Sequence, residues 1–400
     1  MWGEKCLLLA LLGSMFIAPS HGAITEELSS ATNNFTLDFL RASFNSASRQ
    51  NNAILSPLSL YTVLAMVQQG AGGTTQNELN QVLHAQSTST KEGFKSLIQD
   101  LKRSRPTVEL QFANKLFLKS GLNILPDFKN VSVEDFQSDI EAVDFSQAEA
   151  AAQTINSWVS ENTHQRIRDL ITSDKITPST ALLLLNAVFF SGKWDTPFSE
   201  GATVQQEFVT LGGETKNAPT MHYSRKILRA GHCSCVNAKF VHLPFEGSEF
   251  SMLLVVPDER DGLNNVVNNL PGEKLSSFIK LSDRRYVKLE LPKFKFETTS
   301  ELKDTLQVMG LHDIFTDSAN LNGISGGSLK VTDARQKAEI EVDEHGAKAS
   351  AATAIGISFA SALIIPSEEL LEIKADHPFL FFIVDNTNKV PLFSGWVGQP

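Results

Sequence analysis

Cysteine is scarce in this chain, with three residues among 400. Cys6 lies in an apolar N-terminal segment, which leaves Cys233 and Cys235 for the rest of the chain. Two cysteines cannot build the disulfide framework of a small secreted module, and no second pair exists to complete a zinc site. They are therefore expected to be structural, as thiols or as a strained local bridge, and core burial must stabilise the fold.

Positive charge is also in short supply. The chain has 35 Lys and Arg against 45 Asp and Glu, a formal net charge of −10, which argues against a general nucleic-acid-binding protein. No P-loop, dinucleotide-binding fingerprint, H-E-x-x-H sequence or calcium-binding loop occurs. We therefore expect no cofactor, no bound metal and no nucleic-acid partner.

The N-terminus has the three regions of a secretory signal. Lys5 precedes an apolar run from Cys6 to Ala18, and small residues lead to a cleavage position after Gly22. The run is too short to span a bilayer, and no other segment is long enough. The sequence predicts a signal peptide at 1–22 and a secreted monomer without a membrane partner; a buried N-terminal helix is the alternative.

Two sequons are present, Asn34-Phe35-Thr36 and Asn130-Val131-Ser132. In a secreted chain, each predicts an N-linked glycan if its asparagine faces solvent. The alternative for each is a sequon that is not used. Asn34 and Asn130 are therefore the expected glycosylation sites.

The N-terminal half favours helices. Pro57 suits the first turn of a helix that ends at Gly70, with Ser56 as the N-cap. Thr75 and Glu78 have the spacing of a capping box and predict the start of a second helix.

Later segments favour strands, although an amphipathic helix is expected first over 150–163. The apolar run 181–190 is typical of a strand buried on both faces, and Asn186 within it must find hydrogen-bond partners. Segments 286–296 and 337–344 alternate apolar and polar residues, as half-buried strands do. No repeat and no linker divides the chain, which indicates a single α+β domain.

One segment imitates a hydrolase. Residues 323–327, GISGG, satisfy the G-x-S-x-G pattern with Ser325 as nucleophile, and Asp333, His345 and His377 follow as formal triad partners. A nucleophile elbow needs a buried strand before the serine and a helix after it. Here a polar loop precedes the serine and a strand-like segment follows, so we expect no enzyme.

The Ala-, Ser- and Gly-rich stretch 343–367 has the composition of a linker but the period of a strand. Alternate residues form an almost apolar row, which consists of Ala347, Ala349, Ala351, Thr353, Ile355, Ile357 and Phe359. These residues mostly lack the bulk that holds a strand in place, and Gly346 loosens the start. An alternating strand and a surface loop or short helix remain equally open from these residues alone.

The sequence resembles the serpin family along almost its whole mature length. The matching segments are NAILSPLSLYTVLAMVQQGAGGTTQNEL, NAVFFSGKWDTPF, LELPKFKFET, EVDEHGAKASAAT and IKADHPFLFFIVDNTNKVPLFSGWV. The resemblance implies a single domain, 23–400, of three β-sheets and about nine helices, with an exposed reactive-centre loop at about 344–372.

The resemblance also implies a function. A serine protease cuts the loop and forms an acyl-enzyme, and the cut loop then enters the main sheet as an extra strand that traps the protease. The positions of the hinge fall on Glu344, Gly346, Ala347, Ala349, Ala351 and Thr353. His345, Ala347 and Lys348 depart from the residues that the family commonly has there. Hinge Glu344 is expected to pair with Lys293 beside Trp194. Ser56, Ser59, Asn186 and Gln336 match a polar cluster under the sheet centre, with Gln336 where the family often has His.

The family's insertion length places the reactive bond between Ala360 and Ser361. Alanine suits a small, elastase-like pocket, and Phe359 one step earlier would suit a chymotrypsin-like enzyme. No Arg or Lys occurs between Lys348 and Lys374, so a trypsin-like target is the least expected. The segment 361–371 is longer than usual, which leaves cleavage further along the loop open.

Two other functions are alternatives. A non-inhibitory serpin would act as a carrier, storage protein or chaperone, and bulky, charged or proline residues in the hinge would favour it. Clustered cations could bind a polyanion, and they are Lys95, Lys102, Arg103 and Arg105. Because Glu92 and Asp100 are interspersed among them, we expect a solvated helix face and no polyanion binding.

Overall fold

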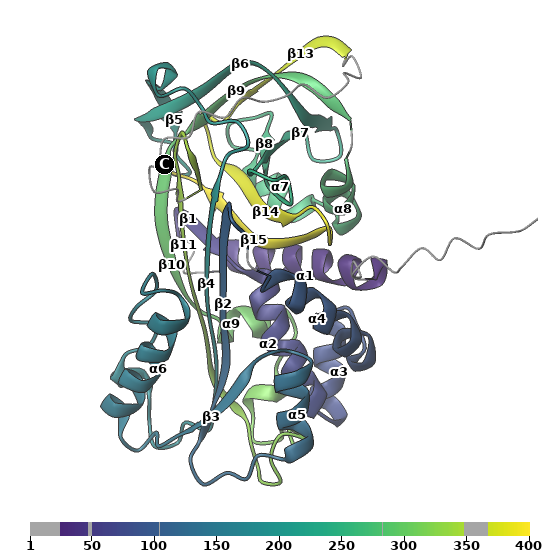
Figure 1. Ribbon diagram of the computed structural model, residues 1–400, viewed down its shortest axis with the longest axis vertical. Coiled ribbons are helices and arrows are strands. Elements are labelled where there is room, and N and C mark those ends of the chain that lie inside the picture. Colours follow the sequence, from purple (N-terminus) through teal and green to yellow (C-terminus); the bar gives the residue numbers. More distant parts are fainter. Residues whose placement is uncertain (1–24, 47–49, 104, 282, 348–366) are drawn as a thin grey trace, which may run out of the picture.

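The computed structural model describes residues 25–46, 50–103, 105–281, 283–347 and 367–400. Within them the chain forms α-helices and β-strands that build three sheets (Figure 1). The helices of this part are α1 (Glu26–Phe44), α2 (Pro57–Gly70), α3 (Gly73–Val82), α4 (Ser87–Leu101), α5 (Pro126–Glu134), α6 (Ala148–Asn162), α7 (Leu263–Asn269), α8 (Gly272–Lys280) and α9 (Lys303–Val308). The expected α+β architecture is confirmed.

The main sheet runs along the long axis of the molecule (Figure 1). Its strands, in spatial order, are β10 (Phe294–Glu301), β11 (Val331–Val342), β12 (Gly346–Ala347), β4 (Leu182–Lys193), β2 (Val108–Lys119) and β3 (Asp139–Val143). Below the short strand β12, β11 and β4 pair directly with each other and run parallel.

The other two sheets share the long strand β6 (Thr215–Cys233). The central sheet has the order β1 (Asn52–Leu55), β15 (Val390–Val397), β14 (Phe379–Asp385), β8 (Phe250–Pro257), β7 (Ala238–Pro244) and β6. The upper sheet joins the first part of β6 to β5 (Val204–Val209) and to β9 (Arg284–Pro292), with β13 (Ser367–Lys374) at its edge.

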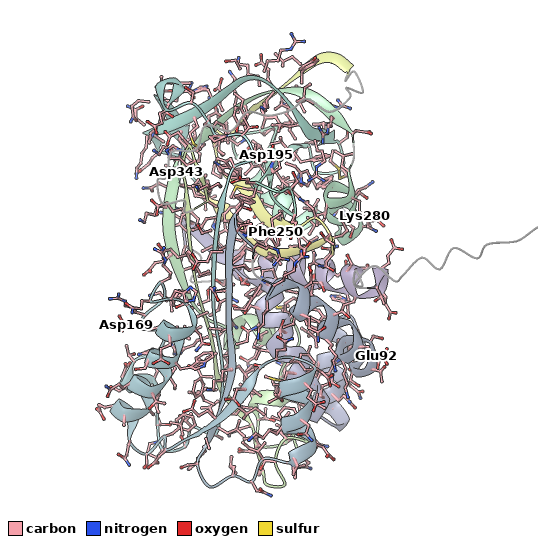
Figure 2. All side chains as sticks on the ribbon, viewed as in Figure 1. Glu92, Asp169, Asp195, Phe250, Lys280 and Asp343 are labelled. Carbon is pink, nitrogen blue, oxygen red and sulfur yellow. A yellow bond between two sulfur atoms is a disulfide. The ribbon has the colours of Figure 1, made fainter. Side chains whose placement is uncertain are left out.

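Strand β4 is buried on both faces, which explains its unbroken apolar sequence. Leu183 and Leu185 join a core cluster that includes Ile155 of α6. Leu182 and Leu184 belong to the large cluster that contains the α2 residues on the opposite face of the sheet. Side chains fill the space between the sheets and the helices on both sides (Figure 2).

Helices α2 and α6 form where the sequence predicts them. Ser56 stands at the expected N-cap position of α2, but its side chain makes no capping hydrogen bond. Its hydroxyl instead donates to the carbonyl oxygen of Leu392, a residue distant in sequence, at 2.9 Å. The expected capping box at Thr75 and Glu78 is also wrong, because α3 begins earlier, at Gly73.

Both residues of that motif bind a distant segment instead. The Thr75 hydroxyl donates to the carboxylate of Asp313 and accepts from the backbone N–H of Asn320 at 2.8 Å. The Glu78 carboxylate accepts the backbone N–H groups of His312 and Asp313, each at 2.8 Å. These contacts join α3 to the 3₁₀ turn η3 (Asp313–Phe315).

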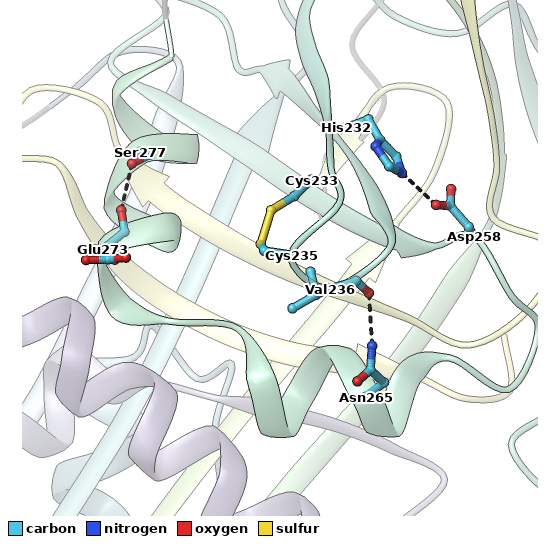
Figure 3. The surroundings of a disulfide bond; sticks show 8 residues. All are labelled: His232, Cys233, Cys235, Val236, Asp258, Asn265, Glu273 and Ser277. Atoms are coloured by element: carbon cyan, nitrogen blue, oxygen red, sulfur yellow. Dashed lines mark hydrogen bonds and ion pairs between the residues drawn. A yellow bond between two sulfur atoms is a disulfide. The ribbon is translucent and has the colours of Figure 1, made fainter.

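Cys233 and Cys235 form a disulfide bond, which settles the choice between thiols and a local bridge. The bond lies at the end of β6, in the turn that leads to β7 (Figure 3). Its Cα atoms are 5.2 Å apart, and it encloses a single residue. Beside it, His232 Nε2 lies 2.6 Å from the carboxylate of Asp258 (Figure 3).

The Thr75 hydroxyl provides a test of the α3 contact. We expect Thr75→Ala to lower the free energy of unfolding by about 1–2 kcal/mol, because the backbone N–H of Asn320 and the Asp313 carboxylate lose their bonds to the buried Thr75 hydroxyl. Thr75→Ser keeps the hydroxyl and should stay close to the wild type. Chemical denaturation of the three proteins measures the difference. An equal loss in both variants would mean that the Thr75 methyl group, and not the hydroxyl, stabilises this contact.

Candidate functional site

A tight turn at the end of β11 sends the chain back into the main sheet. The carboxylate of Asp343 accepts the backbone N–H of His345 at 2.8 Å and that of Gly346 at 3.2 Å. The backbone N–H of Asp343 donates to the carbonyl of Gly346 at 3.0 Å. The turn directs Gly346 and Ala347 toward the gap between β11 and β4.

These two residues form β12, a short strand wedged between β11 and β4. Ala347 pairs with Val342 on one side and with Gly192 on the other, antiparallel to both neighbours. Its side chain is 1% exposed. The expectation that the whole alternating row is exposed in the uncut chain therefore does not hold for Ala347, which already occupies the sheet.

Gly346 is required by close packing. A Cβ atom at this position would lie 2.1 Å from the carbonyl oxygen of Gly192 and 2.8 Å from the Cα of Lys193. Both are backbone atoms of β4, so a side chain would force the two strands apart. Gly346 thus does more than loosen the start of the segment, since it allows β12 to approach β4.

Glu344 and Lys293 meet at the top of the sheet. Lys293 Nζ lies 2.7 Å from one Glu344 carboxylate oxygen, and the Thr203 hydroxyl donates to the other at 2.7 Å. The Glu344 side chain is 7% exposed. Burial raises the pKa of Glu344, but the hydrogen bonds from Lys293 and Thr203 outweigh it and leave the pKa below its usual range. Glu344 is therefore held as a carboxylate at the base of the hinge.

Trp194 is joined to the same turn. Its indole N–H donates to the carbonyl of Asp343 at 2.9 Å, and its backbone N–H donates to the carbonyl of His345 at 2.8 Å. The ring stacks on Phe245 with 4.7 Å between centroids. The structure thus brings together the three residues expected at the sheet top, Lys293, Glu344 and Trp194.

Gln336 links the centre of the main sheet to the start of α2. Its side-chain amide donates to the Asn186 side chain at 2.7 Å and to the carbonyl of Ser56 at 2.9 Å. Its carbonyl oxygen accepts the backbone N–H of Ser56 at 2.7 Å. Gln336 and Asn186 lie opposite each other in the pairing of β11 with β4, so the cluster spans the two strands that must separate if the sheet is to open.

Ser59, the fourth expected member of the cluster, bonds elsewhere. Its hydroxyl donates to Asn114 Oδ1 at 2.5 Å, and Asn114 lies opposite Asn186 in the pairing of β2 with β4. The buried Nδ2 of Asn186 has no hydrogen-bond partner among the described residues. The cluster therefore has one donor that remains to be satisfied.

Three contributors were missed by sequence reasoning: Asp343, Thr203 and Asn114. Asp343 stands three residues before Gly346, a spacing typical of a side-chain-stabilised turn, and could have been found from it. Thr203 and Asn114 have no local signal, because they come from segments distant in sequence.

Some of the expected residues lie outside the part of the chain that the structure describes. They are Ala349, Ala351, Thr353, Ala360 and Ser361, together with the expected signal peptide.

The formal hydrolase residues do not assemble. Ser325 is buried, and its neighbours in the proposed triad have other partners. Asp333 binds Arg335 at 2.6 Å, His345 lies 3.0 Å from Glu200, and His377 bonds the adjacent Asp376.

Across the described ranges there is also no group of side chains suited to a metal ion and no helix able to cross a membrane.

Each of the four clustered cations forms an ion pair or a hydrogen bond within the described part of the chain. Lys95 pairs with Asp135, and Lys102 donates to a backbone carbonyl. Arg103 and Arg105 both bind Glu249, at 3.1 and 2.6 Å. The Arg105 side chain is 7% exposed, so the expectation of a solvated helix face is wrong at this position.

Comparison with known proteins identifies the family. The family model described as serpin (serine protease inhibitor) matches residues 30–400. The leukocyte elastase inhibitor of Bos taurus is 34% identical over 94% of this chain and 100% of its own length, and antichymotrypsin-2 of Bombyx mori is 35% identical over 93% and 99%. The crystal structure of serpin-12 of Manduca sexta covers 92% of this chain and 98% of its own, with 32% identity and a TM-score of 0.81. With this match along the chain and with the hinge strand β12 in the main sheet, the protein belongs to the serpin family.

Proposed function

We propose that this serpin is a secreted inhibitor of serine proteases that acts by loop insertion. In this mechanism the protease cleaves the reactive-centre loop and forms an acyl-enzyme, and the loop then enters the main sheet before deacylation. The observation that supports it most is β12, which already pairs with both β11 and β4 at the upper end of their gap. The path of insertion thus begins in the uncut protein.

The register of β12 defines where later loop residues would lie. Continued in the same antiparallel pairing, Ala349 would come opposite Ile340 and Phe190, and Ala351 opposite Ala338 and Val188. These strand residues all belong to the large core cluster on one side of the sheet. The apolar row of the loop would therefore meet apolar neighbours as it entered.

Thr353 interrupts the apolar row where the sheet is polar. The same register brings Thr353 opposite Gln336 on β11 and Asn186 on β4. The threonine hydroxyl would arrive beside the buried Nδ2 of Asn186, which has no acceptor among the described residues. A hydroxyl at this one position would therefore satisfy a donor that an alanine would leave unpaired.

Insertion requires β4 and β11 to separate. Glu339 and Phe189 form the uppermost direct pair below β12, and the pairs continue down to Val331 and Leu182. Each backbone hydrogen bond broken in this ladder would be replaced by bonds from the entering strand to both neighbours. The new strand would also bury the larger side chains of the loop, so the inserted state is favoured once cleavage frees the loop.

For the target, we propose an elastase-like protease that cleaves between Ala360 and Ser361. The small Ala360 side chain suits a small specificity pocket. One similar protein is named a leukocyte elastase inhibitor and another an antichymotrypsin, which agrees with Ala360 or Phe359 as the residue before the cut. The non-inhibitory alternative, a carrier, storage protein or chaperone, would keep the fold without forming a covalent complex.

Cleavage gives the main test of this function. Incubation with an elastase-like protease should give a covalent complex on a denaturing gel, and mass spectrometry should place the cut after Ala360. Cleaved serpin should melt about 10 °C or more above the intact protein, because burying Ile355, Ile357 and Phe359 stabilises by roughly 1.5–3 kcal/mol each. Cleavage without a complex and without a rise in melting temperature would favour the non-inhibitory alternative.

Ala347→Arg is the matched variant for this experiment. An unpaired charge cannot remain in the apolar gap, so the variant should be cut as a substrate without trapping the protease. Since Ala347 is already buried, the intact variant should also melt below the intact wild type. Lys348→Ala, one position later in the alternation, is the control and should still form the complex.

The Lys293–Glu344 pair gives a second prediction. Lys293→Ala should destabilise the intact protein by about 1–2 kcal/mol, because it leaves a mostly buried carboxylate with Thr203 alone. It should also favour premature insertion or polymers. Lys295→Ala, which removes the exposed pair with Glu341, is the control and should cost under about 0.5 kcal/mol.

The pH dependence of the same pair has a definite sign. The pKa of Glu344 is lower in the folded protein, so its contribution is present at neutral pH and is lost as the pH falls through that pKa. The difference in melting temperature between wild type and Lys293→Ala should therefore shrink on acidification. A difference that stays constant from neutral pH to below the carboxylate range would mean that the pair does not stabilise the hinge.

Secretion and glycosylation give a third prediction. Protein secreted from eukaryotic cells should begin at Ala23 and carry a glycan at Asn130, whose side chain is exposed on α5. Asn34 is half-buried within α1, and its side-chain oxygen packs against Gly272 of α8, so we expect this sequon to stay empty. Enzymatic deglycosylation should shift the wild type and Asn34→Gln equally. A shift that persists in Asn130→Gln would contradict this assignment.

A further inference from the structure

A cavity of about 460 Å³ lies where the central and upper sheets meet. The end of α8, strands β6 and β7 and the turn between β14 and β15 surround it, and Trp194 lines one side. Figure 2 shows Asp195 and Lys280, two residues of its lining, in the upper half of the molecule. Its volume falls within the range of small-molecule sites.

The lining is strongly cationic. It contains five basic residues, Lys226, Arg229, Lys280, Arg284 and Lys389, and one carboxylate, Asp195. The chain as a whole has a formal net charge of −10, so this local excess of positive charge runs against the overall charge. A concave site lined by charge of one sign concentrates its field inside the cavity.

The inner cations are held in place by neutral groups. Arg229 donates to the Asn386 side-chain oxygen at 3.2 Å and to the carbonyl of Leu281 at 3.5 Å. Lys389 donates to the backbone carbonyl of Asn386. These acceptors orient the two side chains without neutralising their charges.

The outer cations are accessible from solvent. Among the described residues, Lys226 and Arg284 have no side-chain hydrogen bond or ion pair, and Lys280 pairs only with the exposed Glu26. By contrast, Arg103 and Arg105 elsewhere share Glu249. Among the described residues, the cavity lining thus contains five basic side chains and one acidic side chain, Asp195.

Like charges at the cavity repel one another. Burial lowers the pKa of Arg229, and the nearby Arg284 lowers it further. Burial also lowers the pKa of Lys389, Arg229 adds to this effect, and only Asp385 opposes it. An anion bound between these groups would relieve this repulsion.

The inner wall is rigid and neutral. His242 is buried between the carbonyl of Phe278 and the hydroxyl of Ser251, at 2.9 and 3.1 Å. Burial lowers its pKa to about 3, so the imidazole carries no charge at neutral pH. The positive charge of the cavity therefore comes from its Lys and Arg side chains.

We propose that this cavity binds a small polyanion that carries two or more phosphate or sulfate groups. Several fixed cations around one volume suit an anion with multiple charges better than a single carboxylate, and Arg229 presents the planar donor group that phosphate and sulfate oxygens accept. The proposal does not depend on protease inhibition, because none of the described residues of the reactive-centre loop lines the cavity.

The test uses inorganic tripolyphosphate as the probe and the intact protein. Calorimetric titration at low salt should show one site, and binding should quench or shift tryptophan fluorescence because Trp194 lines the cavity. Lys226→Gln with Arg284→Gln should weaken binding by tenfold or more. Neither side chain has a hydrogen bond or ion pair with the described residues, so their loss should not disturb folding. The control is Lys288→Gln, whose residue on β9 pairs with Glu372 and does not line the cavity.

Several outcomes would overturn the proposal. Binding that is absent at millimolar tripolyphosphate, or that is equal in the double variant and in the control, would exclude a site in this cavity. Affinity for long heparin chains without affinity for tripolyphosphate would indicate a macromolecular polyanion on the surface and would contradict a small-ligand site. If tripolyphosphate and heparin compete for binding, and the double variant loses affinity for both, the cavity is the common binding site.

Discussion

The gap between β4 and β11 is the constraint on which the rest of this structure depends. The two strands pair directly along most of their length, yet at the top they are held apart by β12. That wedge exists because Gly346 permits backbone contact with β4 and because Ala347 is small and apolar. The sheet is therefore partly expanded at its upper end, where β12 begins directly after the tight turn at Asp343.

Two polar contacts stabilise this arrangement, and one of them is charged while the other is neutral. At the top, the Glu344 carboxylate is charged and held by Lys293 and Thr203, so it anchors the hinge from outside the gap. At the centre, Gln336 and Asn186 are neutral and bridge the two strands from inside the core. An ion pair tolerates partial exposure, whereas buried amides must be paired with each other, which accounts for their different depths.

Gln336 at the centre of the sheet is not titratable, and this has a physical consequence. The Gln336 amide donates and accepts in the contact with Ser56, and it does so at every pH. The centre of the sheet is thus insensitive to protonation. At the top of the sheet, by contrast, the lowered pKa of Glu344 links stability to pH.

The sequence by itself determined the periodic elements and, through the resemblance to serpins, the partners at the hinge. β4 could be predicted because a strand buried on both faces must be apolar throughout, and α2 because Pro57 and Gly70 mark its ends. Only the tertiary structure decided that Ala347 is already buried, that Thr203 completes the Glu344 site, and that Thr75 and Ser56 serve distant partners instead of helix caps. The physical reason is that each polar side chain bonds to whichever partner the packed core brings near, and partners more than a hundred residues away leave no trace in local periodicity.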